Sequence, residues 1–258
     1  MLLASWVMLL SLPMDLALAA SCSSKAPADI VIALDVGHIA GRPGAQCRRF
    51  ETCPWGETSA RGVPEHEFNV RLAQRIKDKL DRAGFRSANL MVTSTEGTDG
   101  LRERTTRANS MHADMFLSIH HDGARDEYLK PWQFEGKALF YFDEPTGFSL
   151  HVSPRFPESL DLARTLADQL AARGLRFTTF HAPESPAGAQ VPFLDASRGI
   201  YRRDHLFVLN RTDMPALLFE AGFIINRDEE LILSSPGHQE KIASAMTDAV
   251  RKFCSADR

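Results

Sequence analysis

The stretch IVIALDVGH, residues 30–38, carries the pattern that decides the fold of this chain. A short apolar run ends on Asp35, turns at Gly37 and presents His38, which is typical of a strand buried on both faces. The pattern recurs in MFLSIH, residues 115–120, and in ALLFE, residues 216–220. Each run therefore predicts a buried strand that ends on a residue able to bind a metal or move a proton.

Amphipathic segments separate these runs. Residues 67–83 place apolar side chains at four-residue spacing and end before Gly84, as in a surface helix of a globular protein. Further helices are predicted over residues 101–112, 157–173 and 236–253, and short strands over 90–93 and 138–142. Residues 175–211 are rich in proline and glycine and predict a long irregular segment. The alternation predicts a single α/β domain with a mostly parallel twisted sheet and helices on both faces.

Four side chains gather where such a fold carries its chemistry. Ligands and catalytic groups of open α/β sheets collect at the carboxyl ends of parallel strands, where His38, His120 and Glu220 are expected. Glu65 comes just before the first predicted helix. Two histidines and two glutamates at one sheet edge predict the site of a zinc hydrolase.

Each of these residues also has a purely structural interpretation. His38 could cap a backbone group, and Glu65 could simply favour the positive end of a helix dipole. Glu220 could form a buried ion pair with Arg104 or Arg227. A carboxylate at the end of an apolar strand is costly unless it is paired, bound to metal or used in proton transfer.

Three neighbouring residues are candidates for supporting roles. Asn69 follows Glu65 by one helical turn, where it could orient that carboxylate. His120 and His121 are adjacent, so only one of them should face a given site. Asp122 could be a ligand or could accept a hydrogen bond from a ligand histidine.

Taken in order, these motifs resemble the zinc-dependent N-acetylmuramoyl-L-alanine amidases of the type 3 amidase family. The matching stretches are DVGH (35–38), EHEFN (65–69), LRER (101–104) with AN (108–109) and AD (113–114), SIHHD (118–122) and EAGFIIN (220–226). The resemblance runs from about residue 30 to residue 253. Single motifs are weak signals, but five in the same order are specific.

The resemblance implies roles for particular residues. His38, Glu65 and His120 match the family's ligands for one Zn²⁺, and Glu220 matches its catalytic glutamate. The family's substrate is peptidoglycan, in which it cuts the amide between N-acetylmuramic acid and L-alanine. Three protein ligands leave one zinc position for water, and a glutamate can then take the proton of that water. We expect a monomer, to which an activator protein could bind.

The chain departs from the family pattern in several places. Val36 stands where the family has proline, and Ile39 and Ala40 replace a double glycine. Residues 46–55 look like an insertion, and residues 175–211 do not match a short-loop version of the fold. Within that long segment, His181 and Glu184 could touch the site or could be ordinary loop residues.

Two other functions remain open at this point. A zinc carboxypeptidase or endopeptidase would cut the wall peptide instead, but such carboxypeptidases usually have a His-x-x-Glu pair, whereas Gly41 stands three residues after His38. A non-catalytic wall-binding relative would lack a zinc ligand or the late glutamate, and all four positions are filled.

The first 20 residues predict a signal peptide that ends in a small-residue cleavage site, although no basic residue precedes its apolar core. An N-terminal anchor helix is the alternative. Residues 21–29 would be a short linker and residues 30–258 the catalytic domain of an exported, periplasmic protein. The formal net charge of -3 gives no basic patch for nucleic acid or for an anionic membrane.

Four cysteines fit an oxidising compartment. Cys47 and Cys53 flank a short loop and could pair with each other. Cys22 and Cys254 could pair if the two termini meet. Alternatively, Ala19-Ala20-Ser21-Cys22 resembles a lipobox, and Cys22 would then carry a lipid and make the protein a lipoprotein.

Overall fold

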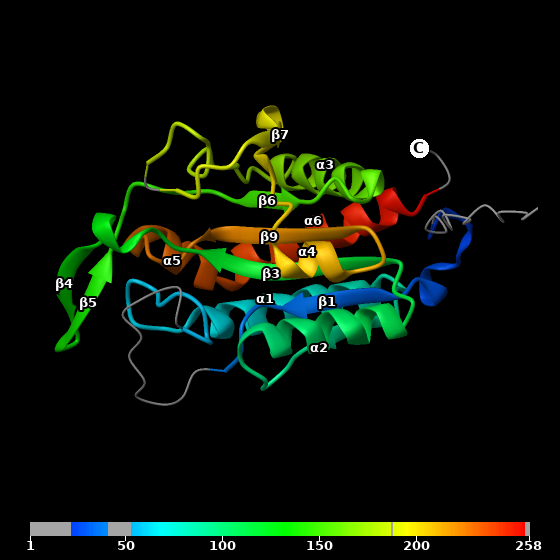
Figure 1. Cartoon of the computed structure of the whole chain (residues 1–258), viewed down its shortest axis with the longest axis horizontal. Coiled ribbons are helices and arrows are strands. Elements are labelled where there is room, and N and C mark those ends of the chain that lie inside the picture. Colours follow the sequence, from blue (N-terminus) through cyan, green and yellow to red (C-terminus); the bar gives the residue numbers. More distant parts are fainter. Residues whose placement is uncertain (1–21, 41–52, 187, 256–258) are drawn as a thin grey trace, which may run out of the picture.

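The computed structural model describes residues 22–40, 53–186 and 188–255, and its centre is a seven-stranded sheet (Figure 1). The strands of this sheet are β1 (Ile32–Val36), β2 (Ala88–Met91), β3 (Met115–Asp122), β6 (Ser149–Val152), β7 (Phe193–Asp195), β8 (Ile200–Arg202) and β9 (Ala216–Phe223). The helices are α1 (Glu65–Arg82), α2 (Gly97–Ser110), α3 (Pro157–Ala171), α4 (Phe207–Arg211), α5 (Arg227–Ser234) and α6 (Pro236–Phe253).

The sheet is mostly parallel, as predicted. Its order is β2-β1-β3-β9-β6-β8-β7, and the first four of these strands are parallel. β6 is antiparallel to β9, β8 is parallel to β6, and β7 is antiparallel to β8. The parallel half therefore points its carboxyl ends to one edge of the sheet, whereas β6 and β8 run away from that edge.

Helices cover both faces of the sheet. α1, α3 and α6 pack over the larger core, and α2 and α4 pack over the smaller one (Figure 1). Side chains alternate along β3, so Ile119 lies in the larger core and Phe116 in the smaller. His120 follows Phe116 by four residues, so its side chain points to the same face of the sheet, which α2 and α4 cover.

The predicted elements are largely present, with shifted ends. α1 starts at Glu65, two residues earlier than predicted, so this glutamate lies in the first helical turn. β3 extends to Asp122 and includes both histidines. The apolar spacing of α1 is confirmed, because Phe68, Leu72 and the two apolar residues that follow at the same spacing are at most 2% exposed.

The prediction for residues 175–211 was wrong in part. This segment contributes β7 and β8 to one edge of the sheet and the short helix α4 to the smaller core. Strands of three residues are too short to show a period in the sequence, and β6, only four residues long, was missed for the same reason. The strand predicted at 138–142 exists as β5 (Lys137–Tyr141), but it pairs only with β4 (Lys130–Phe134), outside the main sheet.

The β4–β5 hairpin projects from the end of the molecule to which β1 and β3 point (Figure 1). Two arginines hold its inner side: Arg227 lies 3.8 Å from the ring centre of Tyr141, and Arg61 lies 5.8 Å from that of Trp132. The Trp132 indole also donates to the carbonyl of Ala60 at 2.9 Å. Cation–π contacts and this hydrogen bond therefore fix the base of the hairpin to the body.

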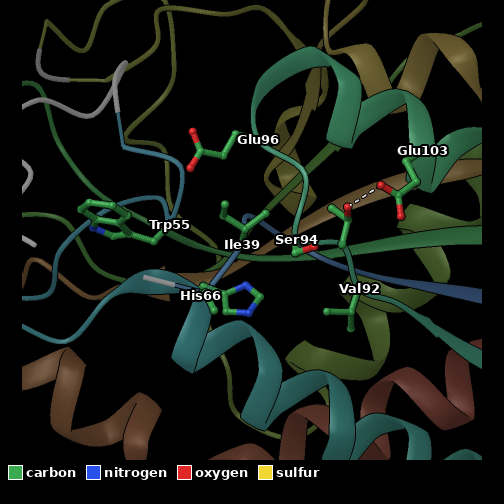
Figure 2. Close-up of a pocket in the computed structure, with 9 residues that line it drawn as sticks. Ile39, Trp55, His66, Val92, Ser94, Glu96 and Glu103 are labelled. Atoms are coloured by element: carbon green, nitrogen blue, oxygen red, sulfur yellow. Dashed lines mark hydrogen bonds between the residues drawn. The ribbon is translucent and has the colours of Figure 1, made fainter. Parts of the chain in front are cut away.

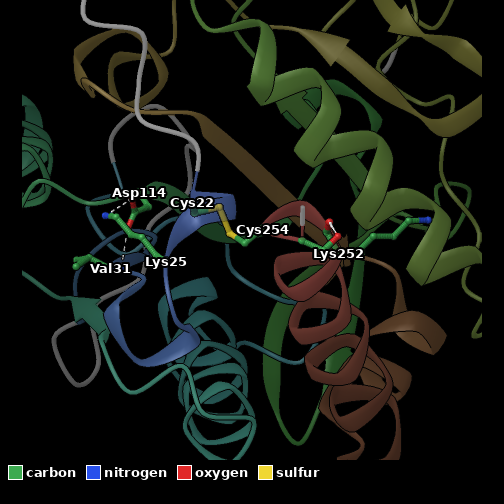
Figure 3. Close-up of a disulfide and its surroundings, with 7 residues drawn as sticks. Cys22, Lys25, Val31, Asp114, Lys252 and Cys254 are labelled. Atoms are coloured by element: carbon green, nitrogen blue, oxygen red, sulfur yellow. Dashed lines mark hydrogen bonds and ion pairs between the residues drawn. A yellow bond between two sulfur atoms is a disulfide. The ribbon is translucent and has the colours of Figure 1, made fainter. Parts of the chain in front are cut away.

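The two ends of the described chain are joined by a disulfide between Cys22 and Cys254 (Figure 3). Their Cα atoms are 5.0 Å apart, within the range that a disulfide spans. Nearby, Lys25 pairs with Asp114, whose other oxygen accepts from the backbone N–H of Val31 at 2.9 Å. The bridge uses the sulfur that a lipid thioether would need, so the predicted lipid on Cys22 is incompatible with this structure.

Several predictions fall outside the described residues. They concern the signal peptide at 1–20, most of the insertion at 46–55, and Cys47, so its pairing with Cys53 stays a prediction. Residues 22–29, expected to be a linker, form two short 3₁₀ turns. Among the helices within the described ranges, none has the length and apolar character to cross a membrane.

Candidate metal centre and active site

His38, Glu65 and His120 form one cluster at the carboxyl edge of the parallel strands. Nε2 of His38 lies 3.0 Å from Oε2 of Glu65, and Nδ1 of His120 lies 3.0 Å from Oε1 of the same carboxylate. One ligand atom from each residue can be chosen so that all three lie within 4.8 Å of one another. We call these three residues the ligand cluster.

Backbone geometry brings the cluster together. His38 follows β1 with φ of 64°, a left-handed conformation that a non-glycine residue adopts only when its surroundings impose it. A Cβ on Gly37 would lie 2.4 Å from the ring of His120, and one on Gly56 would lie 2.2 Å from Oε2 of Glu65. Both positions therefore need glycine, because any side chain would displace a member of the cluster.

Asn69 holds the Glu65 carboxylate in place, as its spacing predicted. Its amide nitrogen donates to Oε1 of Glu65 at 3.0 Å, and the backbone N–H of His121 donates to the same oxygen at 3.1 Å. The ring of His121 turns to the opposite face of β3, where its Nδ1 donates to the Asn69 side-chain oxygen at 2.7 Å. Only His120 of the adjacent pair thus faces the cluster.

The electrostatics of Glu65 suit a cation. Burial raises the pKa of this carboxyl, but His38 and His120 together outweigh burial and hold the pKa well below its usual range. The group is therefore a carboxylate at neutral pH. Two imidazole nitrogens and a carboxylate oxygen converging on one point are a donor set that zinc prefers.

Glu220 lies beside the cluster but is not part of it. In the β3–β9 register it pairs with His120, so the two residues are neighbours across one strand spacing, about 4.8 Å. Burial, and then the charges of Asp122 and Glu65, raise its pKa well above the usual range. Its Oε2 atom is buried and has no hydrogen-bond partner in the described part of the chain. The hydrogen-bonding capacity of this oxygen is therefore not used by the described part of the protein.

The ion pairs that were the structural alternative for Glu220 are not formed. Arg104 instead pairs with Asp35 at 2.5 Å and donates to the carbonyl of Val36 at 3.1 Å, beneath the turn that carries His38. Arg227 pairs with Asp143 at the base of the hairpin. Both arginines therefore have structural partners of their own.

A cavity of about 760 Å³ opens over the ligand cluster and Glu220. It continues along the sheet face to a region that we call the inner end, formed by His151, Arg203, Leu206 and Leu218. The long segment contributes to its wall: Nε2 of His181 is hydrogen-bonded to Oδ2 of Asp122.

The two candidate residues of the segment 175–211 lie in different environments. His181 is buried in the cavity wall, whereas Glu184 is exposed and does not line the cavity.

Three residues that line this cavity were not predicted from the sequence. Glu57 donates its backbone N–H to Oε2 of Glu65 at 3.0 Å, and burial, followed by the charge of Glu65, raises the pKa of its own carboxyl. His151 is on β6 and Arg203 follows β8. Neither of those two strands was predicted, so no pattern in the sequence pointed to these side chains.

A second, smaller cavity of about 460 Å³ lies beside the ligand cluster. Figure 2 shows Trp55, Ile39 and His66 around it, with Glu96 and Glu103 farther along the wall. Nδ1 of His66 is 3.0 Å from the carbonyl of Gly37. Successive residues of the chain thus serve different sites, since Glu65 and His38 face the ligand cluster while His66 and Ile39 face this cavity.

The sheet and the ligand cluster together define an α/β protein with the site architecture of a metal-dependent hydrolase. The chain belongs to the N-acetylmuramoyl-L-alanine amidase family, whose sequence model matches residues 32–252.

Curated relatives agree with this assignment. The N-acetylmuramoyl-L-alanine amidase Rv3717 of Mycobacterium tuberculosis is 25% identical over 244 residues, which cover 90% of this chain and 91% of that protein. The germination-specific N-acetylmuramoyl-L-alanine amidase of Bacillus subtilis is 23% identical over 202 residues, or 73% of this chain and 70% of the relative.

Solved structures show the same fold. The amidase Ami1 of Mycobacterium smegmatis superposes with a TM-score of 0.64 at 24% identity, covering 88% of this chain and 97% of that one. The CwlD amidase of Clostridioides difficile, solved in complex with the GerS lipoprotein, gives a TM-score of 0.62 at 19% identity and covers 89% and 100%.

Proposed function

We propose that this protein hydrolyses the amide between N-acetylmuramic acid and L-alanine in peptidoglycan, with one zinc ion held by His38, Glu65 and His120. The observation that carries the proposal is the convergence of three ligand atoms within 4.8 Å at the carboxyl edge of the sheet. Membership of the amidase family supplies the bond that is cut.

The residues present fit zinc. The cluster offers two nitrogens and one carboxylate oxygen, and it leaves its cavity side open for a water molecule and the substrate. When bound, zinc would polarise the scissile carbonyl and make water a stronger acid. Asn69 would keep the Glu65 carboxylate directed at the ion, since it donates to the oxygen that faces His120.

Glu220 is the general base in this proposal. Its raised pKa and unpartnered Oε2 suit a group that takes a proton from the attacking water and then gives it to the leaving amine of L-alanine. Asp122 and His181, bonded to each other, would form the adjoining cavity wall. Their bond restricts both side chains, so the wall would keep its shape around the substrate.

The same reasoning extends to where the protein acts. Relatives described as probable cell wall amidases imply a secreted or wall-associated protein, and the Cys22–Cys254 disulfide is typical of an oxidising compartment. We propose export to the periplasm by the predicted signal peptide. The GerS complex of the CwlD amidase makes a protein partner a reasonable expectation for this chain as well.

Digestion of purified peptidoglycan followed by mass spectrometry tests the proposal. The expected products are stem peptides with a free L-alanine amine and glycan strands with free lactyl carboxylates. A carboxypeptidase or endopeptidase would shorten the peptides and leave them attached to the glycan. A non-catalytic wall-binding relative would bind the sacculus and release nothing. Either of these two results would overturn the proposed function.

A further inference from the structure

Arg203 is a half-buried cation that forms no ion pair with any of the described residues. Its side chain lines the inner end of the cavity, and its Nε atom is buried without a hydrogen-bond partner. Throughout the described residues, its guanidinium takes part in no ion pair and no side-chain hydrogen bond. The neighbouring Arg202 differs, because it is exposed and pairs with Asp204 at 2.6 Å.

The surroundings of Arg203 disfavour its charge in the free protein. Burial lowers the pKa of the Arg203 guanidinium, while the more distant charges of Glu220 and Asp122 act in the opposite direction. Partial burial without an ion pair removes hydration from a charge and gives little in return. Such a group is expected where a ligand of opposite charge completes the pair.

His151 stands beside Arg203 with a second unsatisfied atom. The residue is 3% exposed, its Nε2 lies 2.9 Å from Oγ of Ser149, and its Nδ1 is buried without a partner. Its ring stacks on Tyr201 at 5.5 Å, which fixes its orientation. Burial, and then the charges of His181 and Arg203, lower the pKa of His151 well below its usual range, so the ring is neutral. If the serine hydroxyl donates to Nε2, Nδ1 carries the hydrogen and can donate to a ligand.

The strand register places these two groups along the path of a peptide. Ser149 pairs with Glu220, and β6 then runs about 10 Å away from the site edge to Val152, which pairs with Arg202. An extended peptide covers about 3.3–3.6 Å per residue. Arg203 follows Arg202 and lines the cavity, so a stem peptide that ran from Glu220 along β6 would reach it at one of the first residues beyond the cut.

The glycan offers no anion for this position, because the lactyl carboxyl of muramic acid is the group tied up in the scissile amide. The peptide does offer one, since the stem residue after L-alanine is D-isoglutamate, with a free α-carboxylate, or its amide. We propose that Arg203 and His151 form a subsite for that carboxylate. This inference rests on the proposed function and specifies which form of the stem peptide the site prefers.

Two synthetic substrates test the subsite: N-acetylmuramoyl-L-alanyl-D-isoglutamate and the same compound with its α-carboxylate amidated. The wild-type enzyme should cleave the acid with a kcat/KM about 10–100-fold higher than the amide, the range expected for charge-assisted hydrogen bonds to a buried group. Arg203→Met should cleave the acid more slowly and the amide at the wild-type rate, so the preference should disappear. The matched control Arg202→Met, at an exposed position, should keep it.

Zinc content and melting temperature separate recognition from folding. An Arg203→Met protein that keeps both and still prefers the acid overturns the subsite, as does a wild-type enzyme that cleaves both compounds equally well. Should Arg203→Met fail to fold, Arg203→Lys keeps the charge but not the planar fork, and it should retain only part of the preference. An unreduced preference in that variant also overturns the proposal. Failure of the proposed function looks different, because neither compound would then be cleaved by zinc-loaded wild-type protein.

Discussion

The ligand cluster and the inner end of the cavity belong to one site but are built by different means. His38 and His120 lie at the ends of mostly apolar, buried strands of five and eight residues, and Glu65 begins an amphipathic helix of 18 residues. His151 lies on a strand of four residues and Arg203 directly follows one of three, and both strands run antiparallel to the parallel half of the sheet. The first region is tightly cross-linked by hydrogen bonds, whereas the second keeps unpartnered polar atoms.

The two regions therefore have different roles within the site. The cluster satisfies its own polar groups and is ready to hold a cation before substrate arrives. The inner end leaves a nitrogen of His151 and one of Arg203 without partners, as suits a surface completed by a ligand. We infer that the cluster carries the chemistry and that the inner end carries selectivity for the peptide. The predictions below test this division, beginning with the largest expected effect.

Removing a member of the ligand cluster should abolish activity. His38→Ala and His120→Ala each leave two protein ligands, so we expect loss of stoichiometric zinc and of measurable hydrolysis. Metal analysis and the peptidoglycan assay would check this. His205→Ala, at an exposed histidine outside the cavity lining, is the matched control and should retain zinc. If both cluster variants keep a full equivalent of metal, this ligand set is wrong.

Changing Glu220 should remove proton transfer and leave the metal in place. Glu220→Gln keeps the shape of the side chain but cannot accept a proton, so the rate should fall by about 10²–10⁴-fold with zinc retained. Single-turnover kinetics on peptidoglycan fragments would measure the loss.

Glu184→Gln is the control for Glu220→Gln, because Glu184 is an exposed glutamate of the cavity-wall segment, and its rate should not change. Near-normal turnover of the Glu220→Gln protein would remove the general-base role. Loss of zinc in that variant would instead make Glu220 a ligand.

A smaller effect is expected at Asn69, which is hydrogen-bonded to the proposed ligand Glu65 but is not itself a proposed ligand. Asn69→Ala removes the donor to Oε1 of Glu65 and the acceptor for His121, so zinc affinity should fall by about 10–100-fold. Competition with a chelator would measure this. The control Asn89→Ala removes only a hydrogen bond to the carbonyl of Ser87. Equal zinc affinity in the two variants would show that the cluster does not depend on Asn69.

The smallest effect on activity should come from the terminal disulfide. The C-terminal end of α6 lies at the end of the molecule opposite to that to which β1 and β3 point (Figure 1). The Cys22–Cys254 bridge directly follows α6 and has a sequence separation of 232. Replacing both with serine should lower the free energy of unfolding by about 2–5 kcal/mol and leave kcat/KM at 25 °C unchanged. Urea denaturation would measure the stability. An unchanged unfolding midpoint would mean that the bridge does not form in solution.

The second predicted bridge can be tested in the same material. Peptide mapping without reductant should recover Cys47 and Cys53 as a linked pair, because a short polar loop separates them and the compartment is oxidising. Recovery of both as free thiols from periplasmic protein would contradict the pairing.

The sequence by itself determined the parallel half of the sheet and the residues at its carboxyl ends. Three strands of that half, β1, β3 and β9, are buried on both faces, so each appears in the sequence as a short apolar run. The end of such a run marks the sheet edge, and so His38, His120 and Glu220 could be predicted to lie together. The helical spacing that placed Asn69 one turn after Glu65 is equally local.

The tertiary structure alone decided the other half. β6 and β8 are too short to show a period, and their places in the sheet depend on pairing with β9 and with each other. His151 and Arg203 reach the cavity only through those long-range contacts, whereas Glu57 reaches it from the loop before α1. A lone histidine, arginine or glutamate outside a periodic segment carries no local signal. The contact between Asp122 and His181, which are 59 residues apart, likewise follows from how the long segment folds back over the sheet.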